Sequence, residues 1–431
     1  MPSVISKFLR VSPFKGFLAV VIALVVSSPS MVISRSADPG AGRDQQTGDV
    51  VVKKLNEPLM AATSRFSFKF YNQLLKQHTD KNVFVSPSSI ILALAMTYNG
   101  AEGKTREAMA RTLEIEGLPL NDVNTGLADF QREVRNADPK VQLKIANSIW
   151  ARQGFTLKPD FIERSKQHYS AEVTSLDFDS PDAATKINSW VKNKTDNLIE
   201  SIIDRISSDQ MLFLINAIYF KGQWKTEFEK AKTKDDDFQL AIGQQKKVPM
   251  MSQSGQYRYL KGEDFQAVSL PYGDGRVNMY VFLPDKGTTL EQFQTKVTFE
   301  NWEAWLKNLR FERGTVMMPR FKVEYEIQLN DALKALGMTE AFDPNLADFS
   351  GIASINSAAR LYISEVKHKA FAEVNEEGTK AAAVTSVGMS TTSMQVPREP
   401  FTMKVDRPFF FAIRDDATGA LLFMGSIVDP K

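Results

Sequence analysis

The sequence predicts a globular protein of the α+β class. Some segments carry apolar residues every three to four positions, which predicts amphipathic helices. Others are short apolar or alternating runs bounded by turn residues, which predict strands. The 431 residues are 43 % hydrophobic and 24 % charged, values typical of a folded chain. A chain of this length can form one large domain or two to three smaller ones.

The composition excludes several kinds of chemistry. The chain has no cysteine, which removes thiol catalysis, disulfides and thiolate metal sites. Its three histidines, His78, His168 and His368, are too few for a histidine-rich metal centre, so no metal and no other cofactor is expected. The net charge of +2 gives no reason to expect nucleic-acid binding. Basic residues in 104–111 are interleaved with glutamates, so a glycosaminoglycan site is not expected either.

Residues 1–36 differ from the rest of the chain. A stretch containing Lys7, Arg10 and Lys15 precedes an apolar run over 17–26 and then a group of small residues. This order predicts an export signal peptide, with a retained N-terminal anchor as the alternative. Residues 37–54 are then a flexible mature N-terminus, and residues 55–431 the folded domain. We therefore expect an exported protein, secreted or periplasmic.

The first part of the folded region is mainly helical in pattern. Residues 55–76 have helical apolar spacing, and residues 82–85 are a short predicted strand. Ser86 and Pro87 then open a helix that is apolar nearly all round and therefore buried. The same reasoning predicts a strand over 143–152 and further helices over 103–113, 123–134 and 187–203.

Strand patterns dominate the second part. Residues 211–220 are an apolar run with one polar member, Asn216, which predicts a buried central strand whose amide needs a hydrogen-bond partner. Helices are expected over 290–309 and 329–336, the second ending at Gly337. Turn signals separate the remaining predicted strands, over 248–251, 257–260, 267–271, 277–284 and 316–323.

The stretch between Lys380 and Arg398 has an unusual composition. It contains no charge, no aromatic residue and no proline before Pro397. With a period of two, one face is free of charge and could be buried in a sheet, while Lys380 lies on the other. That uncharged face consists of Thr379, Ala381, Ala383, Thr385, Val387 and Met389. Composition alone leaves two interpretations open: a linker or long loop, or a segment that is a loop in one state and a strand in another.

Several motifs resemble those of serpins. The stretch Glu376-Glu377-Gly378-Thr379-Lys380-Ala381-Ala382-Ala383 resembles the hinge of the serpin reactive-centre loop. Asp406-Arg407-Pro408-Phe409 and Leu422-Phe423-Met424-Gly425 are similar to the serpin C-terminal signature. The buried helix after Ser86 and the helix over 187–203 also resemble serpin helices. The resemblance covers residues 55–430.

This resemblance implies a serpin fold. That fold is a single large domain with a central, mainly antiparallel five-stranded sheet that accepts the loop as an extra strand, further sheets and about eight to nine helices. The reactive-centre loop would span residues 376–400, with hinge residues Glu376, Glu377, Gly378, Thr379, Ala381, Ala382, Ala383 and Thr385. Polar and aromatic side chains would form the shutter and breach where the sheet opens: Ser86, Ser89, Asn216, His368 and Trp224.

The resemblance further implies an inhibitor of serine proteases rather than an enzyme. A protease would cleave the loop and be trapped in a covalent 1:1 complex with a monomeric inhibitor. Counting from the hinge places the bait bond at Thr392–Ser393, whereas counting back from the C-terminal signature favours Met394–Gln395. A threonine bait suits an elastase-like or subtilisin-like target, and Met394–Gln395 would also suit an elastase-like or chymotrypsin-like enzyme. A non-inhibitory carrier or chaperone with the serpin fold is the alternative.

Overall fold

A five-stranded sheet and a nine-stranded sheet dominate the computed structural model, which describes residues 55–78, 80–241, 243–354, 360–378 and 399–431. The described residues all belong to one compact unit, Val51–Lys431. The predicted signal peptide, the predicted N-terminal tail and loop residues 379–398 lie outside the described residues, so the expectations for them stay predictions.

The five-stranded sheet has the order β11-β13-β5-β2-β4. Its strands are β11 (Phe321–Gln328), β13 (Glu365–Val374), β5 (Leu212–Gly222), β2 (Val141–Arg152) and β4 (Glu172–Leu176). In detail the sheet is mixed, since β13 pairs with β5 and β2 with β4 in parallel, while the other two pairings are antiparallel. Strands β13 and β5 are far apart in the sequence, whereas β2 and β4 are separated only by β3 and α5.

The larger sheet has the order β1-β16-β15-β9-β8-β7-β10-β14, with β6 paired to β7. A separate ribbon joins β3 (Thr156–Leu157) to β12 (Ala353–Ser354). The strands of the larger sheet are β1 (Val83–Val85), β6 (Lys234–Gln239), β7 (Gln245–Lys261), β8 (Phe265–Pro271), β9 (Val277–Pro284), β10 (Arg310–Pro319), β14 (Phe401–Lys404), β15 (Phe409–Asp415) and β16 (Ala420–Ile427).

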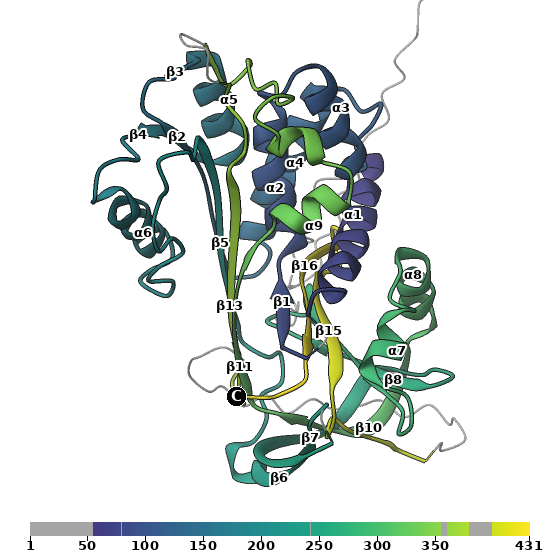
Figure 1. Ribbon diagram of the computed structural model, residues 1–431. Coiled ribbons are helices and arrows are strands. Elements are labelled where there is room, and N and C mark those ends of the chain that lie inside the picture. The colour runs from purple at the N-terminus through teal and green to yellow at the C-terminus, as the bar shows by residue number, and fades with distance from the viewer. Residues whose placement is uncertain (1–54, 79, 242, 355–359, 379–398) are drawn as a thin grey trace, which may run out of the picture. The chain divides into compact units, whose positions relative to one another are not determined.

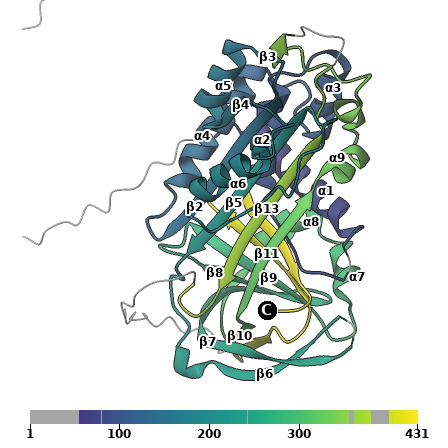
Figure 2. The ribbon, with the colours of Figure 1, turned by 60° about the vertical axis from the view of Figure 1, so that its left-hand side comes forward.

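The helices cover both faces of the five-stranded sheet. Helix α2 lies on one face together with α1, and α6 lies on the opposite face (Figures 1 and 2). In the part of the chain that the structure describes, no helix is long and apolar enough to cross a membrane. The helices are α1 (Glu57–Leu75), α2 (Pro87–Tyr98), α3 (Gly103–Thr112), α4 (Leu120–Arg135), α5 (Pro159–Tyr169), α6 (Ala183–Lys194), α7 (Leu290–Gln294), α8 (Phe299–Asn308) and α9 (Asn330–Ala335), with 3₁₀ turns η1 (Lys230–Lys232) and η2 (Thr339–Phe342).

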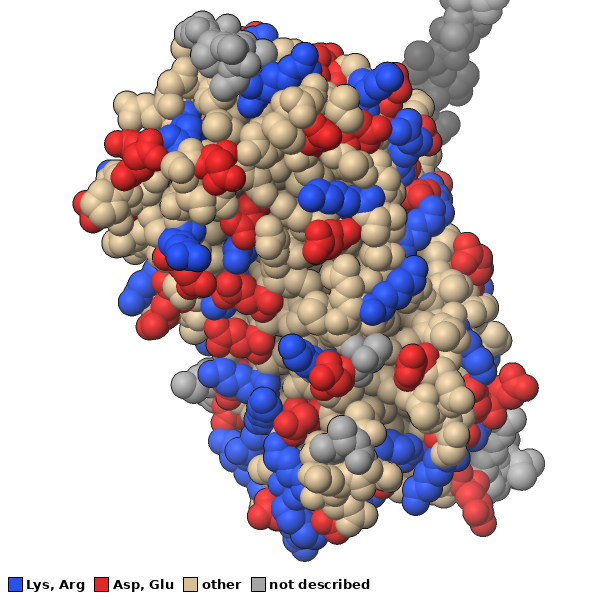
Figure 3. All heavy atoms as spheres, in the orientation of Figure 1, with Lys and Arg blue, Asp and Glu red and all other residues tan. Residues whose placement is uncertain are grey.

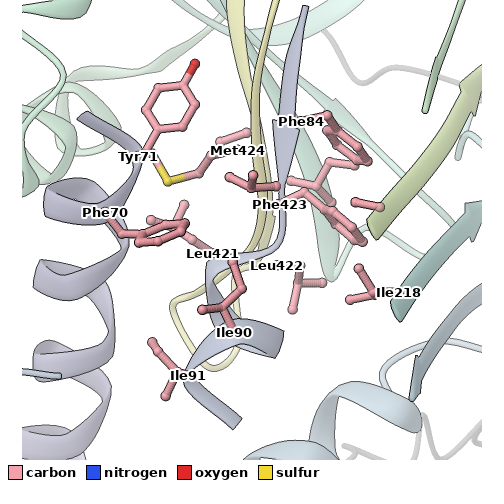
Figure 4. Packing of buried hydrophobic residues seen from close by; sticks show 14 of the residues in the cluster. Phe70, Tyr71, Phe84, Ile90, Ile91, Ile218, Leu421, Leu422, Phe423 and Met424 are labelled. Atoms are coloured by element: carbon pink, nitrogen blue, oxygen red, sulfur yellow. The ribbon is translucent and has the colours of Figure 1, made fainter. Parts of the chain in front are cut away.

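The main core lies between the two sheets. Every residue of α2 is buried, as its all-round apolar sequence predicts, and its N-cap Ser86 accepts a hydrogen bond from the Ser89 amide. Figure 4 shows side chains of α1, α2, β1, β5 and β16 pointing toward one another. A second, smaller apolar cluster fixes α6 to the outer face of the sheet through Ile187 and Val191, which pack with Phe213 and Ile215 of β5.

One predicted helix is shorter than expected. The helix predicted over 187–203 ends at Lys194 as α6. Asp196 and Asn197 follow with φ values of 51° and 64°, in the left-handed region that a continuing helix cannot use. Leu198, expected on the apolar face, is 41 % exposed. The apolar residues that follow return to the same cluster as an irregular segment, which is why the sequence pattern resembled a longer helix.

Three other predicted boundaries were wrong. The strands predicted over 248–251 and 257–260 are one continuous strand, β7, because β10 pairs with it along its length. The helix predicted over 290–309 is interrupted between α7 and α8, where the Thr298 side chain caps α8 by accepting from the Asn301 amide. The strand predicted over 316–323 divides at Arg320 into β10 and β11, which belong to different sheets.

Candidate functional site

The site is built around the pairing of β13 with β5. The two strands run parallel and pair directly over seven residue pairs, from Glu365↔Phe213 to Phe371↔Tyr219. We call this pairing the β13–β5 seam. His368 and Asn216 lie opposite each other near its middle. At the end of β13 the chain continues into the predicted hinge, of which Glu376, Glu377 and Gly378 are described.

The centre of the seam is a fully buried polar cluster. His368 Nδ1 lies 2.5 Å from Asn216 Oδ1, and the Ser86 amide donates to His368 Nε2 at 3.2 Å. Because Nε2 accepts, the imidazole is neutral with its proton on Nδ1, which donates to Asn216. Burial lowers the pKa of His368 to about 3, so this neutral form persists at ordinary pH.

The Asn216 side chain connects the seam to α2 and β2. Its Oδ1 accepts a hydrogen bond from Ser89 Oγ at 2.8 Å, and its Nδ2 donates to Asn147 Oδ1 of β2 at 2.5 Å. The structure thus brings together all four residues predicted for the shutter, Ser86, Ser89, Asn216 and His368. Sequence reasoning missed Asn147, because β2 carries several other polar residues and this amide does not stand alone in an apolar run as Asn216 does.

Trp224 follows the end of β5, at the end of the seam where β13 leads into the hinge. Its ring stacks on Tyr272 with centroids 4.2 Å apart and planes 11° apart. Its Nε1 donates to the Asn375 carbonyl at 2.9 Å, and its backbone amide donates to the Glu377 carbonyl at 3.1 Å. Since Trp224 is itself 4 % exposed and held by stacking, it fixes the backbone of the hinge from two sides.

Glu376 anchors the hinge through its side chain. The carboxylate is buried, lies 2.5 Å from Arg320 Nη2 and accepts a hydrogen bond from Thr233 Oγ1 at 2.8 Å. Burial by itself raises the pKa of Glu376, but the bonds from Arg320 and Thr233 outweigh it, and the pKa is lowered. The neighbouring Glu377 pairs with the exposed Lys230 instead.

Gly378 closes the turn that begins at Asn375. Its φ is +101°, and a Cβ there would lie 2.3 Å from the Gly222 carbonyl oxygen and 2.5 Å from the Trp224 amide nitrogen. Gly378 forms antiparallel bridges with Gln223 and with Asn375. Only glycine fits this backbone and this space. The remaining predicted hinge residues, from Thr379 to Thr385, and both candidate bait bonds over 392–395 lie outside the described residues.

Arg320 and Thr233 were not predicted as parts of the site. Arg320 lies at the junction of β10 and β11, and Thr233 follows η1, so both are distant from Glu376 in the sequence. No local pattern indicates such a contact. Only the meeting of the two sheets places an arginine and a hydroxyl beside this glutamate.

Charges of both signs are interspersed over the face shown in Figure 3, with Lys and Arg gathered toward its lower left. Strand β6 and the C-terminus occupy the same part of Figure 1. Several lysines near these elements are paired with carboxylates: Lys246 with Asp429, Lys247 with Asp237 and Lys404 with Asp236. This pairing gives no added reason to expect a polyanionic partner.

Comparison with known proteins gives consistent results. A family model described as "Serpin (serine protease inhibitor)" matches residues 61–430. An uncharacterized serpin-like protein of Thermococcus kodakarensis is 36 % identical over 389 residues, covering 89 % of this chain and 88 % of that protein. The human leukocyte elastase inhibitor is 35 % identical over 386 residues, covering 87 % of this chain and 100 % of that protein.

A solved structure shows the same fold. The thermophilic serpin Tengpin in its native state aligns with a TM-score of 0.80 and 34 % identity, covering 88 % of this chain and 96 % of that one. The predicted serpin-type α+β fold is therefore confirmed. The family match and the inhibitory relatives indicate a protease inhibitor and not an enzyme.

Proposed function

This chain belongs to the serpin family, and from that premise we propose that it traps serine-type endopeptidases as a suicide substrate. A protease would cleave the loop that follows β13 and remain attached to the new C-terminus as an acyl-enzyme. The upstream segment would then enter the β13–β5 seam as an additional strand. In the resulting 1:1 covalent complex, the active site of the protease would be distorted from the geometry that deacylation needs.

The observation that carries the proposal is the parallel β13–β5 seam with the hinge at its end. A strand that turns back from the end of β13 can lie antiparallel to both β13 and β5. Insertion would exchange one parallel ladder of seven residue pairs for two antiparallel ladders, and parallel pairing is the less stable kind per residue.

The energy of such an insertion is sufficient. About a dozen inserted residues at roughly 0.5–1.5 kcal/mol per net hydrogen bond contribute on the order of ten kcal/mol. Distorting a protease so that it loses one oxyanion-hole donor costs about 3–4 kcal/mol of transition-state stabilisation. Insertion therefore has ample energy to stall hydrolysis of the acyl-enzyme.

The hinge supports this proposal because it sets a register. The Asn375↔Gly378 bridge is antiparallel, and antiparallel partners share a face of the sheet. Continuing it pairs loop residues with buried members of β13: Thr379 with Val374, Ala381 with Ala372, Ala383 with Ala370, and Thr385 with His368. These loop residues form the uncharged face of the loop sequence, and Lys380 falls on the outer face opposite Glu373.

The test is incubation with pancreatic elastase and, separately, with subtilisin, followed by a denaturing gel and the mass of the released C-terminal peptide. A complex that survives SDS supports trapping, and a peptide beginning at Ser393 or at Gln395 identifies the bait bond. Cleavage without a complex but with a gain in heat stability would indicate insertion without trapping. Cleavage without either would favour a non-inhibitory carrier or chaperone.

We also propose that the protein is exported, on the strength of the pattern in residues 1–36. N-terminal sequencing of the protein recovered outside the cytoplasm would test this. A mature N-terminus near residue 37 is the expected result, and a full-length, membrane-retained chain would favour the anchor instead.

A further inference from the structure

One large apolar side chain is unusually exposed. Phe311, near the start of β10, is 71 % exposed, against 56 % for Leu346 and 41 % for Leu198, the other exposed large hydrophobic residues among those described. Single exposed apolar residues are common on protein surfaces. An exposed phenylalanine indicates a binding surface only when the residues around it also suit a partner.

The position of Phe311 relative to the bait loop is defined by strand register. Strand β14 continues directly from that loop and pairs in parallel with β10, with Phe401 opposite Gly314. Phe311 lies three residues before Gly314, so it extends about 10 Å beyond the first residue of β14. Because the strands are parallel, this extension points toward the side from which the loop enters the sheet.

Phe311 belongs to a continuous exposed face. Val316, on the opposite side of β10, is fully buried, so residues at odd positions near the start of the strand face outward. Register with β7 and β14 extends this surface across three strands. We call it the β10 outer face; it comprises Phe311, Arg313, Thr315, Ser254, Gln256, Arg258 and Thr402.

We propose that the β10 outer face is a second contact surface for the protease that attacks the bait loop. This inference rests on the proposed inhibitory function. It adds that the protease is recognised through the body of the inhibitor as well as through the bait residues. The matching protease surface would present an apolar patch with nearby carboxylates beside its active-site cleft.

Distance supports this assignment. Thr402 is nine residues after Ser393, and an extended chain spans at most about 3.3–3.6 Å per residue, so the two lie within roughly 30 Å. A protease of roughly 200–250 residues is about 45 Å across, from the scaling of compact domains with chain length. A protease bound at the bait bond is therefore large enough to reach surfaces near the start of β10.

Composition supports it as well. Aromatic residues and arginine are enriched where protein interfaces derive most of their binding energy. The β10 outer face combines both types with small polar residues and contains no acidic side chain. Contact there would stabilise the first non-covalent encounter and would leave the later insertion step unchanged.

The test compares Phe311→Ala and Arg313→Ala with a matched control, Leu346→Ala, which removes another exposed apolar side chain. The readout is the rate of SDS-stable complex formation with pancreatic elastase and with subtilisin, together with the stoichiometry of inhibition and the melting temperature. We expect Phe311→Ala to slow complex formation by at least about fivefold with the better-trapped protease. Its stoichiometry and melting temperature should match the wild type. Phe311→Tyr should retain the rate.

Two results would overturn the inference while leaving inhibition intact. One is an unchanged rate for Phe311→Ala with both proteases although complexes form normally. The other is a wild-type dimer in sedimentation that Phe311→Ala dissociates, which would assign the face to a second copy of the chain. If the wild-type protein forms no complex with either protease, the proposed function itself fails, and with it the inference that the β10 outer face contacts a protease.

Discussion

His368 of β13 and Asn216 of β5 face each other across a parallel strand pair, with His368 Nδ1 2.5 Å from Asn216 Oδ1. This contact joins the two strands that must separate if the loop is to insert. The amide of Ser86 at the start of α2 donates to the other ring nitrogen. The closed sheet is therefore held at its centre by a neutral histidine with both nitrogens occupied.

Acidification should weaken this closed state. The pKa of His368 is lowered to about 3, below the usual value of 6.5. Between these two pH values the unfolded chain binds a proton at His368 and the folded chain does not. The contribution of His368 to the free energy of unfolding is therefore fully present above pH 6.5 and is lost as the pH falls. From pH 6.5 to pH 5 the expected loss is about 2 kcal/mol. Denaturant unfolding at a series of pH values would measure it.

The control for this pH dependence is His368→Gln. A glutamine amide can donate to Asn216 and accept from Ser86 but does not titrate in this range. Staying above pH 5 keeps carboxylates such as Glu376 ionised, because the pKa of Glu376 is itself lowered. A variant with the same pH slope as the wild type would exclude His368 as the source.

Loss of the Glu376 carboxylate should loosen the hinge. In Glu376→Gln the ion pair with Arg320 is removed at a buried position, and we expect a destabilisation of about 1–3 kcal/mol. The matched control is Glu377→Gln, whose partner Lys230 is exposed, and such pairs contribute roughly 0–1 kcal/mol. Melting temperatures of the uncleaved proteins would compare them. Equal shifts would argue against a special role for Glu376.

A side chain at position 378 should displace the hinge. Gly378→Ala places a Cβ 2.3 Å from the Gly222 carbonyl at φ +101°, whereas Gly287 has the same φ with nothing within 4 Å of its Cβ position. Gly287→Ala thus measures the backbone strain alone, about 1 kcal/mol. Gly378→Ala should cost at least about 1–3 kcal/mol more, as overpacking does. Thermal unfolding would show whether the two substitutions differ.

A charge on the inward face of the loop should convert the inhibitor into a substrate. Thr379→Arg would bury an unpaired charge during insertion, at a cost of several kcal/mol. Slower insertion lets hydrolysis finish first, so the stoichiometry of inhibition should rise by about tenfold or more. Ala382→Arg adds the same charge to the outward face and should change the stoichiometry of inhibition far less. Unchanged inhibition by Thr379→Arg would contradict the insertion register.

Much of the local structure could be predicted from the sequence. The buried α2, the strand around Asn216 and the helix ending at Gly337 follow from apolar spacing and capping residues. The predicted ends of helices and strands were wrong where tertiary contacts override the local sequence pattern. Strand β7 continues through its polar middle because β10 supplies hydrogen-bond partners there, and α6 stops at Lys194 because the next residues adopt left-handed conformations.

The sequence alone determined the serpin family, and it predicted the polar residues of the shutter and the uncharged face of the loop, because hydrophobic periodicity and local motifs depend on residues that are close together in the chain. Only the tertiary structure decided that β13 and β5 pair in parallel, that Asn147 completes the polar cluster, and that Arg320 and Thr233 bind Glu376. These contacts join residues distant along the chain. Their geometry depends on how the two sheets pack, and the spacing of residues along the sequence does not indicate that packing.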